Sequence, residues 1–197
     1  SIPFGLVLTR LAGYGDIRKI GSGNIGATNV LRTGNKTLAL LTVILDAFKA
    51  GFAAYLAEKL VPNEFCFIFG MPASTAVLAA MLAGLCGIIG HMFPVWLKFK
   101  GGKGVSSAFG LLLIIHWQLA LSALGIWLTM AIIFRYSSLS ALTAALAVPF
   151  IAFFTLPQIY TVFCIVIVVM VILKHHTNIV RLLKGEESKI SFKKAKK

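Results

Sequence analysis

Long apolar segments separated by short polar ones follow each other along almost the whole chain. Several of them approach or exceed the ~20 residues that a helix needs to cross a hydrocarbon core of ~30 Å. The apolar segments cover residues 38–61, 65–92, 105–134, 138–154 and 159–173. This pattern predicts an all-α, polytopic membrane protein, in which a helical bundle spans the bilayer several times.

The segment at residues 105–134 is too long for a single span. About 30 residues at ~1.5 Å each would measure ~45 Å, which exceeds the thickness of the hydrocarbon core. His116, Trp117 and Gln118 interrupt the segment, and an indole is typical of the membrane interface. We therefore expect a short helix before this tripeptide and a fuller helix after it.

The first apolar stretch ends near Tyr14 and holds only about 13 residues, fewer than a span requires. A signal peptide would have a basic region before its apolar region, and none precedes this stretch. We expect the sequence to begin inside its first transmembrane helix.

The distribution of basic residues predicts how the helices are oriented. The bases gather in alternate connections, at residues 10–36, 98–103, 135 and 174–197. On this topology all of the 19 Lys and Arg residues except Lys49 and Lys59 fall on one side, which the positive-inside rule identifies as cytoplasmic. The prediction is a bundle of about seven helices, counting the incomplete first one, with a cytoplasmic C-terminus.

Composition supports a membrane protein and limits the other functions. Of 197 residues, 58% are hydrophobic and 13% are charged, against roughly 25% charged in soluble domains. The net charge of +13 lies in short connections, so the positive-inside rule explains it and no nucleic-acid partner is expected. The three cysteines lack metal-ligand spacing, and neither a metal nor a cofactor is expected. We predict a single domain over residues 1–197, in which residues 188–197 form a disordered basic tail that anionic lipid attracts.

Two ionisable residues, Asp46 and Lys49, lie three positions apart inside an apolar span. Each would cost at least ~2.5–3.5 kcal/mol if it faced lipid. We expect them to pair with each other or to face the bundle interior, and a structural role is as plausible as a role in the site.

The first polar cluster is Gly-Ser-Gly-Asn-Ile-Gly-Ala-Thr-Asn at residues 21–29, followed by Arg32. It has the letters of a dinucleotide motif, but no strand-helix-strand pattern accompanies it, so nucleotide binding is not predicted. A flexible backbone with neutral donors and a guanidinium instead favours an anion cradle over a plain loop.

The second cluster runs from Gly90 to Gly104 and contains Gly-Gly-Lys-Gly at residues 101–104. It is not a P-loop, because Leu97 stands where that motif needs glycine and Gly104 stands where it needs Ser or Thr. A glycine turn that opens a helix still offers free N–H groups and the Lys103 ammonium to an anion. His91 is a candidate base or phosphate ligand, and a structural role is at least as plausible.

The third cluster follows the last span. His175, Asn178 and Arg181 share one face of a helix, which predicts either a polar wall of the site or an amphipathic helix that binds lipid headgroups.

These three motifs, in this order, resemble the bacterial membrane acyl-phosphate:glycerol-3-phosphate acyltransferases. The resemblance rests on residues 21–29, on Gly-His-Met-Phe-Pro and Phe-Lys-Gly-Gly-Lys-Gly within 90–104, and on Asn-Ile-x-Arg-Leu-x-x-Gly-x-Glu at 178–187. It implies a multi-pass protein of the bacterial inner membrane whose site faces the cytoplasm. The implied reaction moves a fatty acyl group from acyl phosphate to the 1-position of sn-glycerol 3-phosphate, giving lysophosphatidic acid and phosphate, the first step of phospholipid synthesis. Membrane lipids and an upstream enzyme that makes acyl phosphate are the further partners it implies.

The resemblance also implies the residues of the site. Catalytic roles fall to Ser22, Lys103, His175 and Asn178. Substrate phosphates would be bound by Ser22, Gly23, Asn24, Thr28, Asn29, Arg32, His91, Gly101, Gly102, Lys103, Gly104, Arg181 and Glu187. We expect Arg32 and Lys103 to hold the two phosphates. The proton acceptor stays open between the acyl phosphate itself and a histidine.

Two alternatives from other classes remain at this point. An organic-anion transporter of the inner membrane also needs a basic site in a helical bundle, but commonly places it at the midplane between inverted repeats. A non-catalytic lipid-binding scaffold would use the same basic surface without a reaction.

Overall fold

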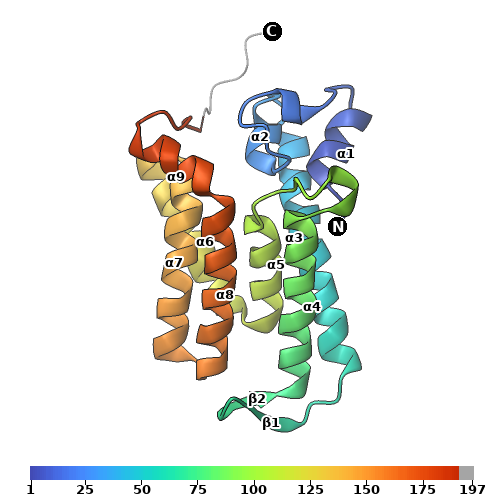
Figure 1. The fold of residues 1–197 in the computed structure, drawn as a ribbon, viewed down its shortest axis with the longest axis vertical. Helices are drawn as coiled ribbons and strands as arrows, with labels where there is room; N and C mark the ends of the chain where they lie inside the picture. The colour runs from blue at the N-terminus through green and yellow to red at the C-terminus, as the bar shows by residue number, and fades with distance from the viewer. Residues whose placement is uncertain (191–197) are drawn as a thin grey trace.

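The computed structural model describes residues 1–190, and most of them are helical (Figure 1). The elements in chain order are α1 Phe4–Leu11, the 3₁₀ turn η1 Ile17–Lys19, α2 Ala27–Leu31, α3 Lys36–Leu60, β1 Phe65–Ile68, β2 Met71–Ser74, α4 Thr75–Met92, the 3₁₀ turn η2 Val95–Leu97, α5 Val105–Ile115, α6 Trp117–Phe134, α7 Ser137–Thr155, α8 Gln158–Lys174 and α9 His176–Leu183.

The long helices run side by side along the long axis of the molecule (Figure 1). α3 packs against α4 and α5, α6 packs against α7, and α7 packs against α8. The short α5 lies between the two groups and supplies much of the core, including the fully buried Leu111. The β hairpin closes one end of the bundle, whereas α2 and α9 lie at the other (Figure 1).

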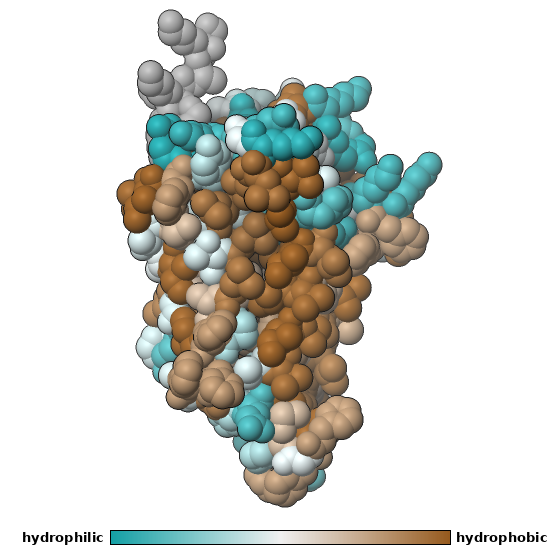
Figure 2. Space-filling model, turned by 60° about the vertical axis from the view of Figure 1, so that its left-hand side comes forward, coloured by the Kyte–Doolittle hydropathy of each residue, from teal (hydrophilic) through white to brown (hydrophobic). Residues whose placement is uncertain are grey.

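The helices fit the predicted membrane bundle. Four of them within residues 1–190 are long and apolar enough to span a bilayer, and α8 with α9, bent by 64° to each other, makes a fifth if the pair is counted as one span. The seven predicted helices correspond to α1 and to α3 through α8. An apolar band covers most of the height of the molecule, with hydrophilic residues gathered above it (Figure 2). The protein is therefore a multi-pass membrane protein, as the hydrophobic pattern predicts.

The predicted span at residues 65–92 is wrong at its start, because the helix begins only at Thr75. Residues 65–74 form an antiparallel hairpin in which Phe65 faces Ser74. Its turn uses positive φ angles at Phe69 and Gly70. An apolar run cannot by itself distinguish strand from helix, and here the choice depends on packing of the hairpin against the end of the core.

Other boundaries agree with the sequence. The predicted break falls at His116, whose extended backbone separates α5 from α6.

The predicted basic tail, however, begins with ordered residues, because the backbone N–H of Ile190 donates to the Arg135 carbonyl at 2.6 Å. The rest of that tail, residues 191–197, lies outside the described residues.

Glycines let α3 and α5 touch through their backbones. A Cβ atom added to Gly110 of α5 would overlap the Ala47 carbonyl of α3, and one added to Gly51 would lie 2.7 Å from the Gly110 oxygen. Contact this close is typical of helix pairs in membranes. It fixes α5 against α3, and so fixes the end of α5 that carries the glycine loop.

Gly110→Ala is expected to lower the free energy of unfolding by ~1–3 kcal/mol, because the added methyl must push the two helices apart. Thermal unfolding in detergent measures the effect. Gly125→Ala on α6 is the matched control, since no atom beyond the neighbouring turns of its own helix lies within 4 Å of its added Cβ. Equal melting temperatures for the two variants would contradict this account of the crossing.

Candidate functional site

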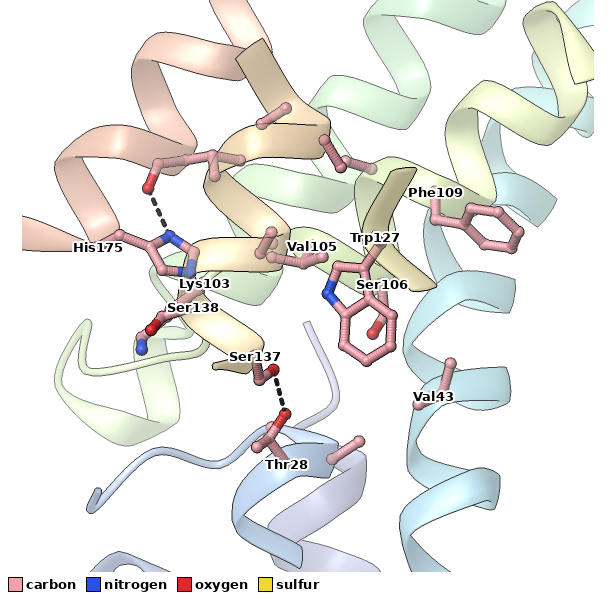
Figure 3. A pocket seen from close by; sticks show the side chains of 18 of the residues that line it. Thr28, Val43, Lys103, Val105, Ser106, Phe109, Trp127, Ser137, Ser138 and His175 are labelled. Carbon is pink, nitrogen blue, oxygen red and sulfur yellow. Dashed lines mark hydrogen bonds between the residues drawn. The ribbon is translucent and has the colours of Figure 1, made fainter. Parts of the chain in front are cut away.

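A cavity of about 590 Å³ opens in the bundle, with polar residues at the end where α2 and α9 lie. Helices α3, α5, α6, α7 and α8 line the rest with mostly apolar side chains. In Figure 3, Lys103 and His175 lie on one side of the cavity, and Trp127, Phe109 and Val43 on the other. The polar residues that line it are Ser22, Asn24, Thr28, Asn29, Arg32, Asp46, His91, Lys103, Ser106, Ser137, Ser138, His175, Asn178, Glu187 and Ser188. All three sequence motifs therefore meet at one cavity.

Asn29 shapes the loop of the first motif. Its amide nitrogen donates to the Ile17 carbonyl at 2.7 Å and to the Asn24 carbonyl at 2.8 Å. Its amide oxygen accepts from the Ser22 N–H and from the Arg32 guanidinium, both at 3.2 Å. Because these bonds occupy both ends of the buried amide, Asn29 acts on the site by holding Ser22 and Arg32 in place.

The remaining side chains of the first motif differ in what they contact. Thr28 is hydrogen-bonded to Ser137 at 2.9 Å (Figure 3), which joins the loop to α7. Arg32 donates to the hydroxyl of Ser188. Asn24 accepts from the Gly26 N–H at 2.9 Å. The loop thus closes the polar end of the cavity, while Gly23 stays outside the cavity lining.

In the second motif, the expectation of free glycine N–H groups is wrong at two positions. The Gly101 N–H donates to the Met92 carbonyl at 3.2 Å, and the Gly102 N–H donates to the His91 carbonyl at 3.1 Å. These carbonyls end α4, whose last turn needs partners for them. The loop therefore folds back onto α4, and it is Lys103, with Gly104 next to it, that reaches the cavity.

Glu187 holds the third motif together. Its carboxylate accepts from the Asn178 amide at 2.6 Å, from the Arg181 guanidinium at 2.6 Å and from the Ser138 hydroxyl at 2.7 Å. The buried Asn178 in turn accepts from the Lys103 ammonium. Arg181 does not line the cavity, but it lies behind Glu187 as its ion-pair partner.

His175 is buried where α8 ends and α9 begins. Its Nδ1 lies 2.8 Å from the Val171 carbonyl, as the dashed line in Figure 3 shows. Because a carbonyl can only accept, the proton of a neutral ring is on Nδ1 and the lone pair is on Nε2. His175 can therefore accept a proton at the cavity.

Positive charge exceeds negative charge at the polar end. Burial, together with the nearby Arg181 and Arg32, lowers the pKa of Lys103 to about 8, while Glu187 opposes the shift. Burial raises the pKa of Glu187, but its hydrogen bonds from Ser138, Arg181 and Asn178 outweigh this and leave the pKa below its ordinary value. Three bases thus surround the Glu187 carboxylate, and the Asp46 carboxylate of the same cavity is paired with Lys49. The remaining positive charge favours a bound anion.

The sequence did not indicate Ser137, Ser138 and Ser188 as cavity residues. Ser137 and Ser138 begin α7, and Ser138 is the first residue of the predicted span, so two consecutive hydroxyls at that end are a weak signal. Ser188 lies in a segment that was expected to be disordered. The predicted pair Asp46 and Lys49 does form, with 2.6 Å between carboxylate and ammonium.

Glycerol-3-phosphate acyltransferase is the family that matches residues 1–185. A glycerol-3-phosphate acyltransferase of Mesorhizobium japonicum is 53% identical over 194 residues, covering 98% of this chain and 91% of the relative. One from Caulobacter vibrioides is 52% identical over 195 residues, covering 98% and 84%.

Two crystal structures are also similar to this chain. PlsY (YgiH), an integral membrane glycerol 3-phosphate acyltransferase, superposes in its glycerol 3-phosphate form with a TM-score of 0.83 at 36% identity, over 96% of this chain and 89% of that one. Its lysophosphatidic acid form gives a TM-score of 0.81 at 35% identity, over 95% and 88%. Sequence and fold agree over nearly the whole length, and the chain belongs to the glycerol-3-phosphate acyltransferase family.

Proposed function

We propose that this protein transfers a fatty acyl group from acyl phosphate to the 1-hydroxyl of sn-glycerol 3-phosphate. The products are lysophosphatidic acid and inorganic phosphate. The observation that carries the proposal is a single cavity that joins a cationic end, with Arg32 and Lys103, to a wall of apolar side chains such as Phe109 and Trp127. The cationic end suits the two substrate phosphates, and the apolar wall suits an acyl chain. The solved relative is known in a glycerol 3-phosphate form and in a lysophosphatidic acid form, which supports the same acceptor and product here.

In the proposed site Arg32 and Lys103 bind the phosphates of the two substrates. The Arg32 guanidinium can bind a phosphate through two parallel hydrogen bonds, whereas the Lys103 ammonium acts as a compact charge. Ser22, Asn24 and Asn178 orient the bound groups. Lys103 is held by Asn178, so its charge is already in place before substrate arrives, which is the arrangement that lowers a barrier most effectively.

The proposed step breaks one bond and forms another. The 1-hydroxyl oxygen of glycerol 3-phosphate attacks the carbonyl carbon of acyl phosphate, and the carbon–oxygen bond to phosphate breaks. Phosphate leaves with that electron pair, so the acyl carbon undergoes no redox change. The hydroxyl proton goes either to an oxygen of the departing phosphate or to Nε2 of His175. Because a mixed anhydride is already activated, positioning and charge neutralisation supply most of the acceleration.

His175→Ala separates the two proton acceptors. If the departing phosphate takes the proton, the variant keeps measurable activity and its pH–rate profile is shifted, since only a neighbouring group has gone. If Nε2 of His175 is the base, activity is expected to fall by the ~10²–10⁴-fold that general base catalysis contributes. Steady-state rates across pH 5–10 decide between them. His176→Ala, which changes the exposed neighbour, is the matched control and should match the wild type.

The cationic end of the bundle is proposed to face the cytoplasm of a bacterial inner membrane. The described bases lie largely at this end, in η1, at Arg32 after α2, in the glycine loop and in α9, and cytoplasmic loops carry such an excess. Both substrates would then reach the site from the cytoplasmic side, and an upstream enzyme that makes acyl phosphate would supply the donor. The relatives and structures compared above are acyltransferases, and none is a transporter.

Release of inorganic phosphate from acyl phosphate by the purified protein tests the proposal. We expect phosphate and lysophosphatidic acid to form in equal amounts, and only when glycerol 3-phosphate is present. Acyl-CoA and acyl carrier protein should not replace acyl phosphate. Phosphate release without an acceptor, or acyl transfer that needs acyl-CoA, would contradict the donor assignment.

The pH dependence of kcat/KM should report Lys103. Its pKa in the folded protein is lowered to about 8, mainly by burial, so the ammonium that binds phosphate is present below this pH and is lost above it. We expect kcat/KM to fall about tenfold per pH unit above that point. Lys103→Arg is the control, because a guanidinium stays charged up to pH ~12 and should remove the alkaline decline. A flat wild-type profile to pH 10 would contradict the assignment.

A further inference from the structure

Asp46 of α3 and His91 of α4 are buried and line the cavity, and the partly buried Lys49 of α3 joins them in one cluster. Lys49 Nζ lies 2.6 Å from Asp46 Oδ1 and 2.6 Å from His91 Nδ1. His91 Nδ1 is also 3.4 Å from the same Asp46 oxygen. Groups this costly to bury inside a membrane protein normally serve the site, and the proposed chemistry uses none of the three.

The contacts of Lys49 determine the tautomer of His91. A charged ammonium has three N–H donors and no lone pair. It meets three acceptors here, namely the Asp46 carboxylate, His91 Nδ1 and the Ile2 carbonyl at 3.1 Å. We take Lys49 as the charged partner in its ion pair with the Asp46 carboxylate. His91 Nδ1 must therefore accept, so the ring proton lies on Nε2 and the lone pair is already used.

The other edge of the His91 ring lies against the glycine loop. A Cβ atom added to Gly102 would overlap Nε2 and come within 2.6 Å of Cε1 and 2.9 Å of Cδ2. The Gly102 N–H also donates to the His91 carbonyl. Backbone and ring of His91 thus both contact the residue that immediately precedes Lys103.

The cluster also joins the elements around the loop. The Ser107 hydroxyl, in the first turn of α5, donates to the Asp46 carbonyl at 2.8 Å. The loop that carries Lys103 is therefore attached on one side to α4 through His91 and on the other to α3 through Ser107. Through Ile2 the ammonium of Lys49 adds the segment before α1.

We propose that Asp46, Lys49 and His91 are positioning residues, in which Lys49 fixes the tautomer of His91 and the imidazole ring fixes the loop that presents Lys103. The ring acts as a wedge against Gly102, not as a base or a phosphate ligand. The importance of the His91 ring for catalysis rests on the function proposed for Lys103. The assignment of the His91 tautomer is independent of that function.

Nitrogen-15 NMR of protein labelled at histidine tests the tautomer without any substrate. His91→Gln identifies the resonances of His91 among the four histidines. At pH 7 we expect a neutral ring with an unprotonated Nδ1 and a protonated Nε2. In Lys49→Met this signature should be lost, because no donor then meets Nδ1. A wild-type His91 that is protonated at Nδ1, or a signature unchanged in Lys49→Met, would overturn the proposal even if the enzyme is fully active.

A double-mutant cycle tests the wedge. Gly102→Ala in the wild-type background should lower kcat by at least about 50-fold, because the added methyl displaces the loop. In a His91→Ala background the methyl enters the space left by the ring, and the further loss should be under about fivefold. Equal losses in both backgrounds would mean that Gly102 is required for another reason and would overturn the wedge.

The melting temperature in detergent is followed through the same cycle. Gly102→Ala should lower the melting temperature less in the His91→Ala background than in the wild type. The melting temperature remains measurable where activity is too low to compare. Non-additive kcat with additive melting temperatures still supports positioning of Lys103, whereas additive losses of kcat overturn it. Where activity is too low to compare, additive melting temperatures overturn it. Failure of the proposed function itself would appear separately, as a wild-type protein that releases no phosphate with glycerol 3-phosphate.

Discussion

Lys103→Met is expected to lower kcat/KM for acyl transfer by ~10³-fold or more while the protein stays folded. The change keeps an unbranched side chain of similar length and removes the charge that reaches the cavity beside Asn178. Loss of one preorganised donor to developing negative charge costs ~2.7–4 kcal/mol, and each ~1.4 kcal/mol is a factor of ten in rate. The measurement is glycerol 3-phosphate-dependent phosphate release from acyl phosphate.

Lys100→Met is the matched control for this variant. It removes the same charge from the same segment, but from an exposed position outside the cavity lining. We expect its kcat/KM to stay within about twofold of the wild type, because exposed charges are screened by salt. If both variants lose activity equally, the loop attracts anions only by its total charge and Lys103 has no special position.

Arg32→Met is expected to raise KM for glycerol 3-phosphate by ~100-fold, with a smaller loss in kcat. The guanidinium faces the polar end of the cavity and is oriented by the Asn29 amide at 3.2 Å. Losing a paired, bidentate contact to phosphate weakens ground-state binding of that substrate. Separate titrations of the two substrates locate the effect, and a rise confined to acyl phosphate would reassign Arg32 to the donor.

Two further variants sharpen this result. Arg32→Lys keeps the charge but loses the planar fork, so it should recover only part of the affinity. Arg10→Met removes an exposed arginine that pairs with Asp16 near the same face and should leave both KM values unchanged. An equal effect of Arg10→Met would show that the surface field, not the site, determines substrate binding.

Much of the fold could be predicted because the signals are local. Apolar runs, interrupted at His116, gave the helices and the break between α5 and α6. The hairpin at residues 65–74 could not be predicted, because its apolar residues fit a strand and a helix equally well. The order at Ser188–Ile190 was missed for a related reason, since the partners of these residues, Arg32 and Arg135, are remote in sequence.

The candidate site divides in the same way. Three motifs with bases and glycines marked Ser22, Arg32, Lys103, His175 and Asn178 as candidates, and the structure places all five at one cavity. What each one does there depends on contacts between motifs. Nothing near Asn178 in the sequence indicates that it holds Lys103, because the two residues are 75 positions apart in the chain.

The sequence alone determined a multi-pass helical membrane protein, its basic end and the residue types proposed to bind anions, because hydropathy and charge are properties of each residue and its immediate neighbours. Tertiary structure decided which glycine N–H groups are already hydrogen-bonded, which donors the Glu187 carboxylate accepts from and which nitrogen of His91 is proposed to carry the proton. Each of these depends on a hydrogen-bond partner brought close by helix packing, and a partner defined only in three dimensions leaves no pattern along the chain.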